Sequence, residues 1–243
     1  MVDIEAHFRA QARWVTSRET NPSSRVVYAP FEPNDAISGA CADVLAPPEM
    51  DRAARFGPHP LKAHFLQRRA FQRFCVSRAL HGELRLAEIE LVHDDKGRPM
   101  LPQAAHLHFS FASSSGCFIG AWSHQGSVGV DLQEPVKTIE PQALAKTCFT
   151  RRERERMDRC VSDAERADMF YRLWCLKEAA LKSIGEGLPF GMDRFEFEIG
   201  VDARCLSAPD PCGAPKHVSC YEYRVEEAYA ALVRLDGPGA PAT

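Results

Sequence analysis

The stretch from Phe170 to Ile184 constrains the fold of this chain more than any other. Its apolar residues recur at spacings of three and four, which predicts a helix with one buried face. Gly185 and Gly187 follow directly, as expected where a helix ends. The apolar stripe consists of Phe170, Leu173, Trp174, Leu181 and Ile184. We expect the chain to be organised around this helix.

Two charged side chains share another face of the same helix. Glu178 and Lys182 are four residues apart, so they lie one turn apart on one side. Taken alone, such a pair is most often a solvated ion pair that contributes roughly a few tenths of a kcal/mol. A second stretch of the chain, residues 128–134, changes this interpretation.

Residues 128–134 read VGVDLQE and alternate like a strand. Because successive strand residues face opposite sides, Asp131 and Gln133 share one face and Glu134 points away. A carboxylate at the end of a strand, together with one on a helix, is a common way to hold Mg²⁺, which usually completes its shell with substrate phosphates. The ordinary alternative for Asp131 is a solvated acid at the edge of a strand.

The composition is that of an ordinary globular protein, with 45% hydrophobic and 26% charged residues among 243. This length allows one large domain or two small ones with a real core. The net charge of −3 gives no indication of nucleic-acid binding. No apolar run approaches the roughly 18 residues of a membrane span, and the acidic N-terminal stretch is not typical of a secretory signal. We expect a cytoplasmic protein that binds neither nucleic acid nor membrane.

Nine cysteines are scattered along the chain. No two are separated by two residues, so the spacing does not predict a zinc site. We expect reduced, buried thiols. Cys175 lies inside the 170–184 helix with no adjacent histidine, which favours a packing residue over a nucleophile.

The remaining patterns predict an α+β fold, with one long helix followed by a run of strands in each half. We expect an N-terminal extension at 1–24, an N-terminal lobe at 25–125, a C-terminal lobe at 126–236 and a disordered tail at 237–243. Helices are expected near 34–45, 49–56, 64–80, 141–148, 150–158 and 162–185. Strands are expected near 25–31, 86–92, 106–111, 117–123, 127–133, 194–199, 217–223 and 229–235.

Three segments of the first half carry residues suited to an anion site. Two arginines lie one turn apart on the 64–80 helix, and guanidinium forks suit phosphate. A turn at 93–99 has basic residues on both sides of a glycine, and the loop ASSSG at 112–116 offers hydroxyls and backbone donors. The alternatives are solvated arginines, a plain turn and a flexible hairpin connection. The candidate residues are Arg69, Arg73, Lys96, Arg98, Ser113 and Ser114.

Residues 150–159 read TRRERERMDR and predict a charged helix with Thr150 as its cap and Glu153 completing a capping box. Its arginines could present positive charge to an acidic partner protein. A solvated face of arginines paired with the interleaved glutamates is at least as compatible with the pattern.

Together these motifs resemble the 4′-phosphopantetheinyl transferases of the larger, surfactin-synthetase-activating (Sfp) type. The arrangement is G-x-D-x-(E/Q), about forty residues, and then W-x-x-K-E-A-x-x-K-x-x-G. FLQRRAFQR at 65–73, GRP at 97–99 and FSFASSSG at 109–116 occupy the places of three further family landmarks, in the family's order. The residues that match the two main motifs are Gly129, Asp131, Gln133, Trp174, Lys177, Glu178, Ala179, Lys182 and Gly185.

The resemblance implies two similar α/β lobes related by a pseudo-twofold axis, with coenzyme A (CoA) in the cleft between them. It implies transfer of 4′-phosphopantetheine from CoA to a serine hydroxyl of an apo acyl or peptidyl carrier protein, with release of 3′,5′-ADP. The implied cofactor is Mg²⁺, with Mn²⁺ as an alternative. Because two lobes of one chain could build the cleft, we expect a monomer.

The resemblance also implies roles for individual residues. Asp131, Gln133 and Glu178 would hold the metal against the CoA pyrophosphate. Glu178, directly or through a water, would take the serine proton, and Lys182 would neutralise the leaving phosphate. The residues expected to contact the CoA phosphates or adenosine are Arg69, Arg73, Lys96, Arg98, Ser113, Ser114, Lys177 and Lys182.

Two positions depart from the family pattern. Gln133 stands where an acidic metal ligand is common, so we expect weaker Mg²⁺ binding or a water in its place. The loop histidine of the family is replaced by Ser113 or its neighbour. These departures keep a catalytically impaired CoA-binding protein as an alternative, and a nucleotide hydrolase is a third candidate. The motifs do not distinguish fatty-acid, polyketide and peptide carriers.

Overall fold

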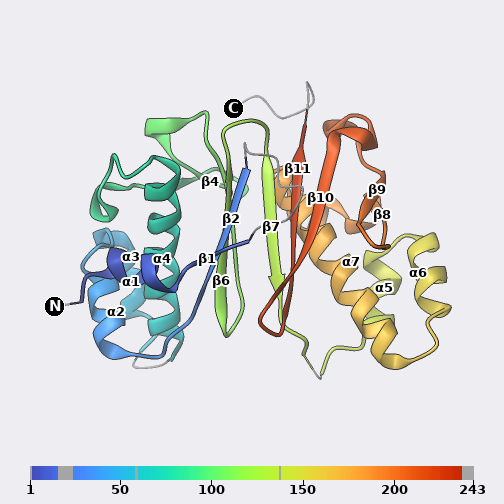
Figure 1. Cartoon of the computed structure of the whole chain (residues 1–243), viewed down its shortest axis with the longest axis horizontal. Helices are drawn as coiled ribbons and strands as arrows, with labels where there is room; N and C mark the ends of the chain where they lie inside the picture. Colours follow the sequence, from blue (N-terminus) through green and yellow to red (C-terminus); the bar gives the residue numbers. More distant parts are fainter. Residues whose placement is uncertain (1, 16–23, 58–59, 137, 237–243) are drawn as a thin grey trace.

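The computed structural model describes residues 2–15, 24–57, 60–136 and 138–236. These residues form two halves that lie side by side, each with helices and a sheet (Figure 1). The predicted α+β class is confirmed. That the two halves are similar lobes related by a twofold axis stays a prediction.

The first half is built on an antiparallel sheet with strand order β1-β2-β6-β5. Its strands are β1 (Arg13–Trp14), β2 (Ser24–Pro30), β5 (His108–Ser113) and β6 (Cys117–Ser123), and a separate ribbon pairs β3 (Val92–His93) with β4 (Pro99–Met100). Its helices are α1 (Ile4–Gln11), α2 (Asp35–Ala42), α3 (Pro47–Ala54) and α4 (Pro60–Ala79).

The second half is built on an antiparallel sheet with strand order β10-β11-β7. Its strands are β7 (Val128–Gln133), β10 (Val218–Val225) and β11 (Ala228–Leu235), and a ribbon pairs β8 (Glu196–Glu198) with β9 (Arg204–Ser207). Its helices are α5 (Pro141–Cys148), α6 (Arg151–Asp158) and α7 (Asp163–Ser183).

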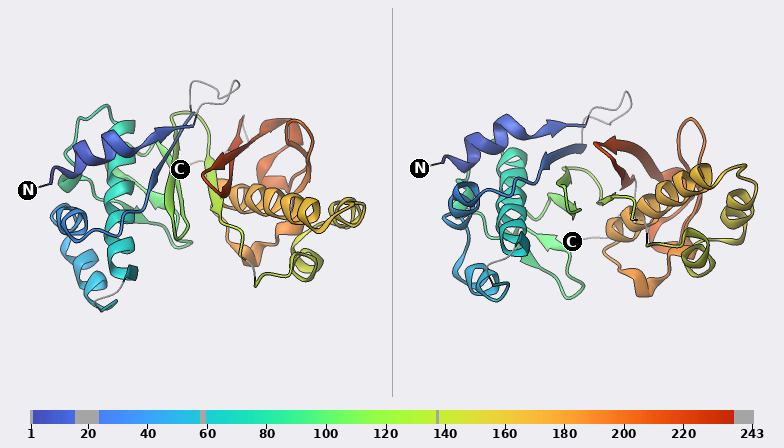
Figure 2. Two further views of the ribbon diagram at one scale, coloured as in Figure 1. Left: turned by 60° about the horizontal axis from the view of Figure 1, so that its bottom comes forward. Right: turned by 90° about the horizontal axis from the view of Figure 1, so that it is seen from below.

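The two sheets lie in the middle of the molecule and the helices cover their outer faces (Figure 2). A core cluster joins the sheets and includes Val26, Ile119, Val130 and Leu232. Two further clusters fill the space between each sheet and its long helix, α4 in one half and α7 in the other. This arrangement brings β7 of the second half next to the sheet of the first half.

The predicted long helix is observed as α7, and both of its ends follow from local residues. The Ser162 side chain accepts a hydrogen bond from the Glu165 backbone N–H at the N-terminus. Gly185 has a φ of +70° just past the C-terminus, and the Glu186 N–H donates to the Leu181 carbonyl over 2.9 Å. In the described ranges neither α7 nor any other helix is long and apolar enough to span a membrane.

Two parts of the predicted organisation are wrong. Residues 2–15 are not an extension, because Ile4 and Phe8 are buried in the core of the first half and β1 pairs with β2. Residues 86–92 are not a strand: Leu86–Glu88 form a short 3₁₀ turn, and pairing begins only at β3. The predicted tail at 237–243 lies outside the described residues.

Candidate active site

Gly129 allows β7 and α7 to approach each other more closely than any other residue would. A Cβ atom added at this position would lie 1.9 Å from the Ala179 carbonyl oxygen and 2.5 Å from the Ser183 nitrogen. Glycine is therefore required by backbone contact here, not by an unusual dihedral angle. Because Asp131 follows two residues later on the same face of β7, it also faces α7.

Asp131, Glu178 and Lys182 form one charged cluster between β7 and α7. The Lys182 Nζ donates to Asp131 Oδ1 over 2.7 Å and to the Val130 carbonyl over 3.1 Å. Burial raises the pKa of Glu178, and the nearby Asp131 carboxylate raises it further, while Lys182 acts in the opposite direction. Two carboxylates from different elements thus interact across the β7–α7 contact.

Gln133 lies two residues beyond Asp131 on β7, half-buried, and its side-chain amide donates to the Glu134 carbonyl over 2.9 Å. Within the described ranges, no three His, Cys, Asp or Glu side chains are grouped so that they could hold a metal ion. A carboxylate that raises the pKa of a second one, with an amide on the same strand face, is a set of oxygen donors suited to a hard divalent cation.

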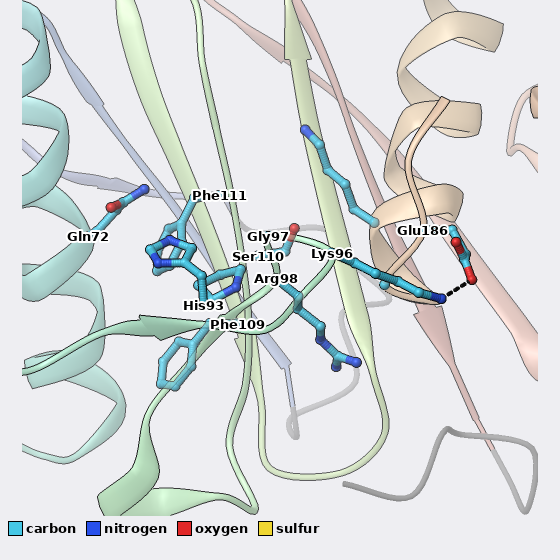
Figure 3. Close-up of a pocket in the computed structure, with 12 residues that line it drawn as sticks. Gln72, His93, Lys96, Gly97, Arg98, Phe109, Ser110, Phe111 and Glu186 are labelled. Carbon is cyan, nitrogen blue, oxygen red and sulfur yellow. Dashed lines mark hydrogen bonds and ion pairs between the residues drawn. The ribbon is translucent and has the colours of Figure 1, made fainter. Parts of the chain in front are cut away.

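A cavity of about 200 Å³ opens beside Lys182 at the junction of the two halves (Figure 3). Figure 3 shows Gln72 and His93 on the first-half side and Glu186 at the end of α7 on the other. A second cavity of about 530 Å³ adjoins it and is lined mainly by apolar side chains such as Val92 and Met100. Both cavities are lined by Lys96, Arg98, Pro99 and Gly185.

Lys96 and Arg98 of the first half extend to the C-terminal end of α7. The Lys96 ammonium forms an ion pair with Glu186, and 58% of the Lys96 side chain is exposed. The Arg98 Nη2 lies 3.0 Å from His108 Nδ1 and donates to the Ser127 hydroxyl over 2.7 Å. Together with Lys182, these two side chains give the first cavity three positive charges.

Arg69 and Arg73 are not on a solvated face, and they lie with Glu49 of α3. Arg73 is 2% exposed, and both of its terminal nitrogens donate to the Glu49 carboxylate, over 3.1 and 2.6 Å. The prediction of Arg73 as a phosphate ligand is therefore corrected to an internal ion pair. The Arg69 Nε also pairs with Glu49, and its Nη1 donates to Gln72 over 2.7 Å, beside the cavity wall.

Lys177 does not face the cavity, although its neighbour Glu178 lies in the charged cluster. Its side chain is 0% exposed, and its Nζ contacts Glu153 over 2.7 Å and the Met192 and Phe195 carbonyls over 3.0 and 2.7 Å. The prediction that Lys177 contacts a phosphate is wrong, because its ammonium is enclosed in the core of the second half.

We expect Lys177→Met to destabilise the fold while leaving the cluster in place. Removing one partner of a buried ion pair leaves Glu153 charged without compensation, which costs about 3–5 kcal/mol. Chemical denaturation should show this loss, and the kcat of the folded protein should change little. Arg151→Met is the control, since Arg151 is 86% exposed and pairs with Glu155 on its own helix. A large loss of kcat at unchanged stability would contradict the structural role.

The serine loop binds an anion, but that anion belongs to the chain itself. The Ser114 and Ser115 hydroxyls and the Gly116 N–H all donate to the Glu134 carboxylate. The prediction that Ser114 binds a CoA phosphate is therefore corrected: its hydroxyl is engaged within the protein. Ser113 lies at the end of β5, half-buried, opposite Phe118 of β6.

Several cavity residues were not predicted from the sequence. Gln72 and His93 line the first cavity from α4 and β3, and Ser110 and Phe111 line it from β5. Glu186 follows the helix-ending Gly185. Gln72, Ser110 and Phe111 lie inside two of the segments that resemble family landmarks, but they were not singled out there, because their place in the cavity depends on pairing or packing of distant segments.

Three arginines of α6 are ion-paired, and Arg154 donates to the Lys146 and Phe149 carbonyls. Arg151 contacts Glu155 over 2.7 Å, Arg152 contacts Glu196 over 3.7 Å, and Arg156 contacts Glu198 over 3.6 Å. Of the two predictions for this helix, the face of paired charges therefore fits better than the basic surface for an acidic partner protein.

A family model of the 4′-phosphopantetheinyl transferase superfamily matches residues 127–233 of the chain. This part of the chain is therefore similar to that superfamily. The match begins at β7 and ends in β11, so it contains Gly129, the charged cluster and Gln133. Lys96 and Arg98 lie outside it, in the first half of the chain.

Individual relatives agree with the family model. The chain is 29% identical over 163 residues to the 4′-phosphopantetheinyl transferase Sfp of Bacillus subtilis. The aligned region covers 65% of this chain and 68% of that protein. It is 30% identical over 159 residues to the 4′-phosphopantetheinyl transferase psf-1 of Bacillus pumilus, with 65% of each covered. It is 35% identical over 127 residues to the L-aminoadipate-semialdehyde dehydrogenase-phosphopantetheinyl transferase of Xenopus laevis, covering 46% of this chain and 40% of that protein.

Proposed function

We propose that the chain transfers the 4′-phosphopantetheine group of CoA to a serine hydroxyl of an apo acyl or peptidyl carrier protein and releases 3′,5′-ADP. The observation that carries this proposal is the ion pair of Asp131 and Lys182, with Glu178 close enough to interact electrostatically with both, beside a cavity that Lys96 and Arg98 also line. The similarity to proteins named 4′-phosphopantetheinyl transferases supports the same activity.

The Asp131 and Glu178 carboxylates, with the Gln133 side-chain oxygen, are the residues that would hold Mg²⁺, or Mn²⁺ in its place. The bound ion would supply positive charge for the CoA pyrophosphate. The fit follows from the donor set, since carboxylate and amide oxygens suit hard cations and the two acids lie close enough to raise the pKa of Glu178.

In the proposed reaction, the carrier serine oxygen forms a bond to the β-phosphorus of CoA, and the bond from that phosphorus to the bridging oxygen breaks. Glu178 takes the serine proton. Its pKa is raised by burial and by Asp131, which makes it a stronger base than an exposed carboxylate. The departing 3′,5′-ADP carries the new negative charge, and the Lys182 ammonium lies on the cavity side to neutralise it.

Lys96 and Arg98 are the proposed partners of the 3′-phosphate and the adenosine side of CoA. Both line the two adjoining cavities, and Arg98 is held in place by Ser127 and His108. Lys96 would exchange its ion pair with Glu186 for one with a phosphate. In this proposal Arg69 acts indirectly: it donates a hydrogen bond to Gln72, which lines the cavity.

We expect Gln133→Glu to retain transfer activity and to lower the Mg²⁺ concentration that half-activates the enzyme. A third carboxylate beside Asp131 and Glu178 would strengthen attraction for a divalent cation. Initial rates over a Mg²⁺ titration measure the effect, with Glu155→Gln as a control in an exposed ion pair with Arg151. Complete loss of activity in Gln133→Glu would exclude Gln133 from the metal site.

Intact-mass measurement of apo carrier proteins incubated with CoA, Mg²⁺ and the enzyme tests the proposal. We expect the carrier to gain about 340 Da, the approximate mass of phosphopantetheine, and 3′,5′-ADP to appear in equal amount. A protein that only binds CoA gives neither product, and a hydrolase gives 3′,5′-ADP without a carrier. The first alternative is less favoured, because Asp131, Glu178 and Lys182 are all present, Asp131 and Lys182 are paired, and both affect the charge of Glu178. A panel of carriers from fatty-acid, polyketide and peptide synthesis identifies the pathway.

A cytoplasmic, monomeric enzyme remains part of this proposal. All nine cysteines are free thiols in the structure. The cavity is lined by both halves of a single chain, so no second copy is needed to complete it.

A further inference from the structure

We propose that Glu134 is a positioning residue for the metal-binding face of β7. The Glu134 clasp, formed by Ser114, Ser115, Gly116 and Glu134, ties the end of β7 to the first half of the molecule. This inference rests on the proposed function, because it concerns the strand that carries Asp131 and Gln133. The family resemblance assigns no role to Glu134.

The clasp has three donors for one carboxylate. The Ser114 hydroxyl donates to Glu134 Oε1 over 2.6 Å, the Ser115 hydroxyl to Oε2 over 2.5 Å and the Gly116 N–H to Oε1 over 2.9 Å. The two oxygens of this one carboxylate thus accept three hydrogen bonds from consecutive residues of one loop. Charge-assisted bonds of this kind are stronger than neutral ones.

The loop that supplies the donors is itself fixed to the first half. The His64 Nε2 of α4 lies 2.7 Å from the Ser114 carbonyl oxygen, and the Phe31 N–H donates to the Gly116 carbonyl over 2.8 Å. Gly116 fits the carboxylate closely, because an added Cβ would lie 2.8 Å from Glu134 Oε1. The clasp therefore connects Glu134 to α4 and to the end of β2.

Glu134 lies where the strand pairing of β7 stops. The register between β7 and β11 ends at the pair Gln133–Tyr229, so the backbone just after Gln133 has no place in this ladder. The Gln133 side-chain amide donates to the Glu134 carbonyl over 2.9 Å. Fixing Glu134 thus fixes the direction of the Gln133 side chain, and it holds the strand end two residues beyond Asp131 against the first half.

Hydrogen exchange on the free protein tests the clasp without any ligand or activity. We expect Glu134→Ala to speed amide exchange in residues 131–136 by about tenfold, with α5 and β10 unchanged. Ser114→Ala/Ser115→Ala should act in the same direction. Glu155→Ala is the matched control, since Glu155 pairs with a neighbouring helix residue on α6. Unchanged exchange at 131–136 in both clasp variants would overturn the proposal.

Mn²⁺ binding, followed by electron paramagnetic resonance in the presence of CoA, separates positioning from plain stability. We expect the dissociation constant for Mn²⁺ to rise about tenfold in Glu134→Ala, as for other residues that orient metal ligands. The combined Ser114→Ala/Ser115→Ala/Glu134→Ala variant should bind Mn²⁺ no more weakly than Glu134→Ala does, because all three changes remove the same interaction. Faster exchange with unchanged Mn²⁺ affinity would overturn the positioning role. Wild-type protein that binds Mn²⁺ and CoA but modifies no carrier would refute the proposed function and leave this test standing.

Discussion

Replacing Glu178 by glutamine is expected to lower the rate of carrier modification by about a thousandfold, with CoA binding largely retained. The substitution keeps the size of the side chain but removes the proposed base and one carboxylate of the metal site. Single-turnover rates by intact mass, with CoA affinity by calorimetry, separate the two effects. Asp163→Asn is the control, an exposed acid at the start of the same helix. A loss of less than tenfold would exclude Glu178 as the base.

The same variant is expected to unfold at a higher denaturant concentration than the wild type when no metal is present. The pKa of Glu178 is raised in the folded state, so its favourable contribution is complete below the pKa of an unfolded carboxyl group. That contribution is lost as pH rises through the raised pKa, because the charged form is disfavoured by burial and by Asp131. Glutamine has no such loss. Equal stability of the two proteins from pH 4 to 8 would contradict the assigned environment.

Gly129→Ala is expected to abolish transfer by separating β7 from α7. The added Cβ would clash with the Ala179 carbonyl oxygen and the Ser183 nitrogen. Both are backbone atoms of α7, so neither can move without shifting the helix. Overpacking at such a contact should cost about 3 kcal/mol or more. Any relief by shifting β7 also moves Asp131 away from Lys182 and Glu178. Thermal unfolding and Mn²⁺ binding in the presence of CoA measure the two consequences.

Gly39→Ala is the matched control for this prediction. Gly39 lies within α2, and a Cβ there would have no neighbour within 4 Å. Alanine at this position should stabilise the protein by roughly 0.5–1 kcal/mol, since glycine is a poor helix former. If Gly129→Ala resembled Gly39→Ala in stability and activity, the close approach of β7 and α7 would not be needed to build the site.

The helix and strand that carry the candidate site could be predicted because their signals are local. Periodic apolar residues and Gly185 define α7, and alternation places Asp131 and Gln133 on one face of β7. That Asp131 lies near Glu178 was implied only by the combined motif, and the direct bond between Asp131 and Lys182 was not predicted. The reason for Gly129 could not be predicted, because it depends on a backbone 50 residues away.

For some of the corrected residues the sequence held a signal that was overlooked, and for others it holds no signal at all. Lys177 lies four residues from both Leu173 and Leu181, so its place on the apolar stripe was visible in the spacing. Its partner Glu153 was not, and neither was the Glu49 partner of Arg73, because pairing between separate helices leaves no mark in the sequence. The serine loop was predicted as a candidate anion site, but the carboxylate it binds, that of Glu134, follows strand β7 of the other half.

A crystal structure with CoA and Mn²⁺, read through the anomalous signal of manganese, tests the central claim most directly. We predict a single strong peak between β7 and α7, contacted by the Asp131 and Glu178 carboxylates and by the CoA pyrophosphate, with Lys96 and Arg98 on the adenosine side. A manganese peak away from these two carboxylates, or CoA bound outside the cavity between the halves, would contradict the account.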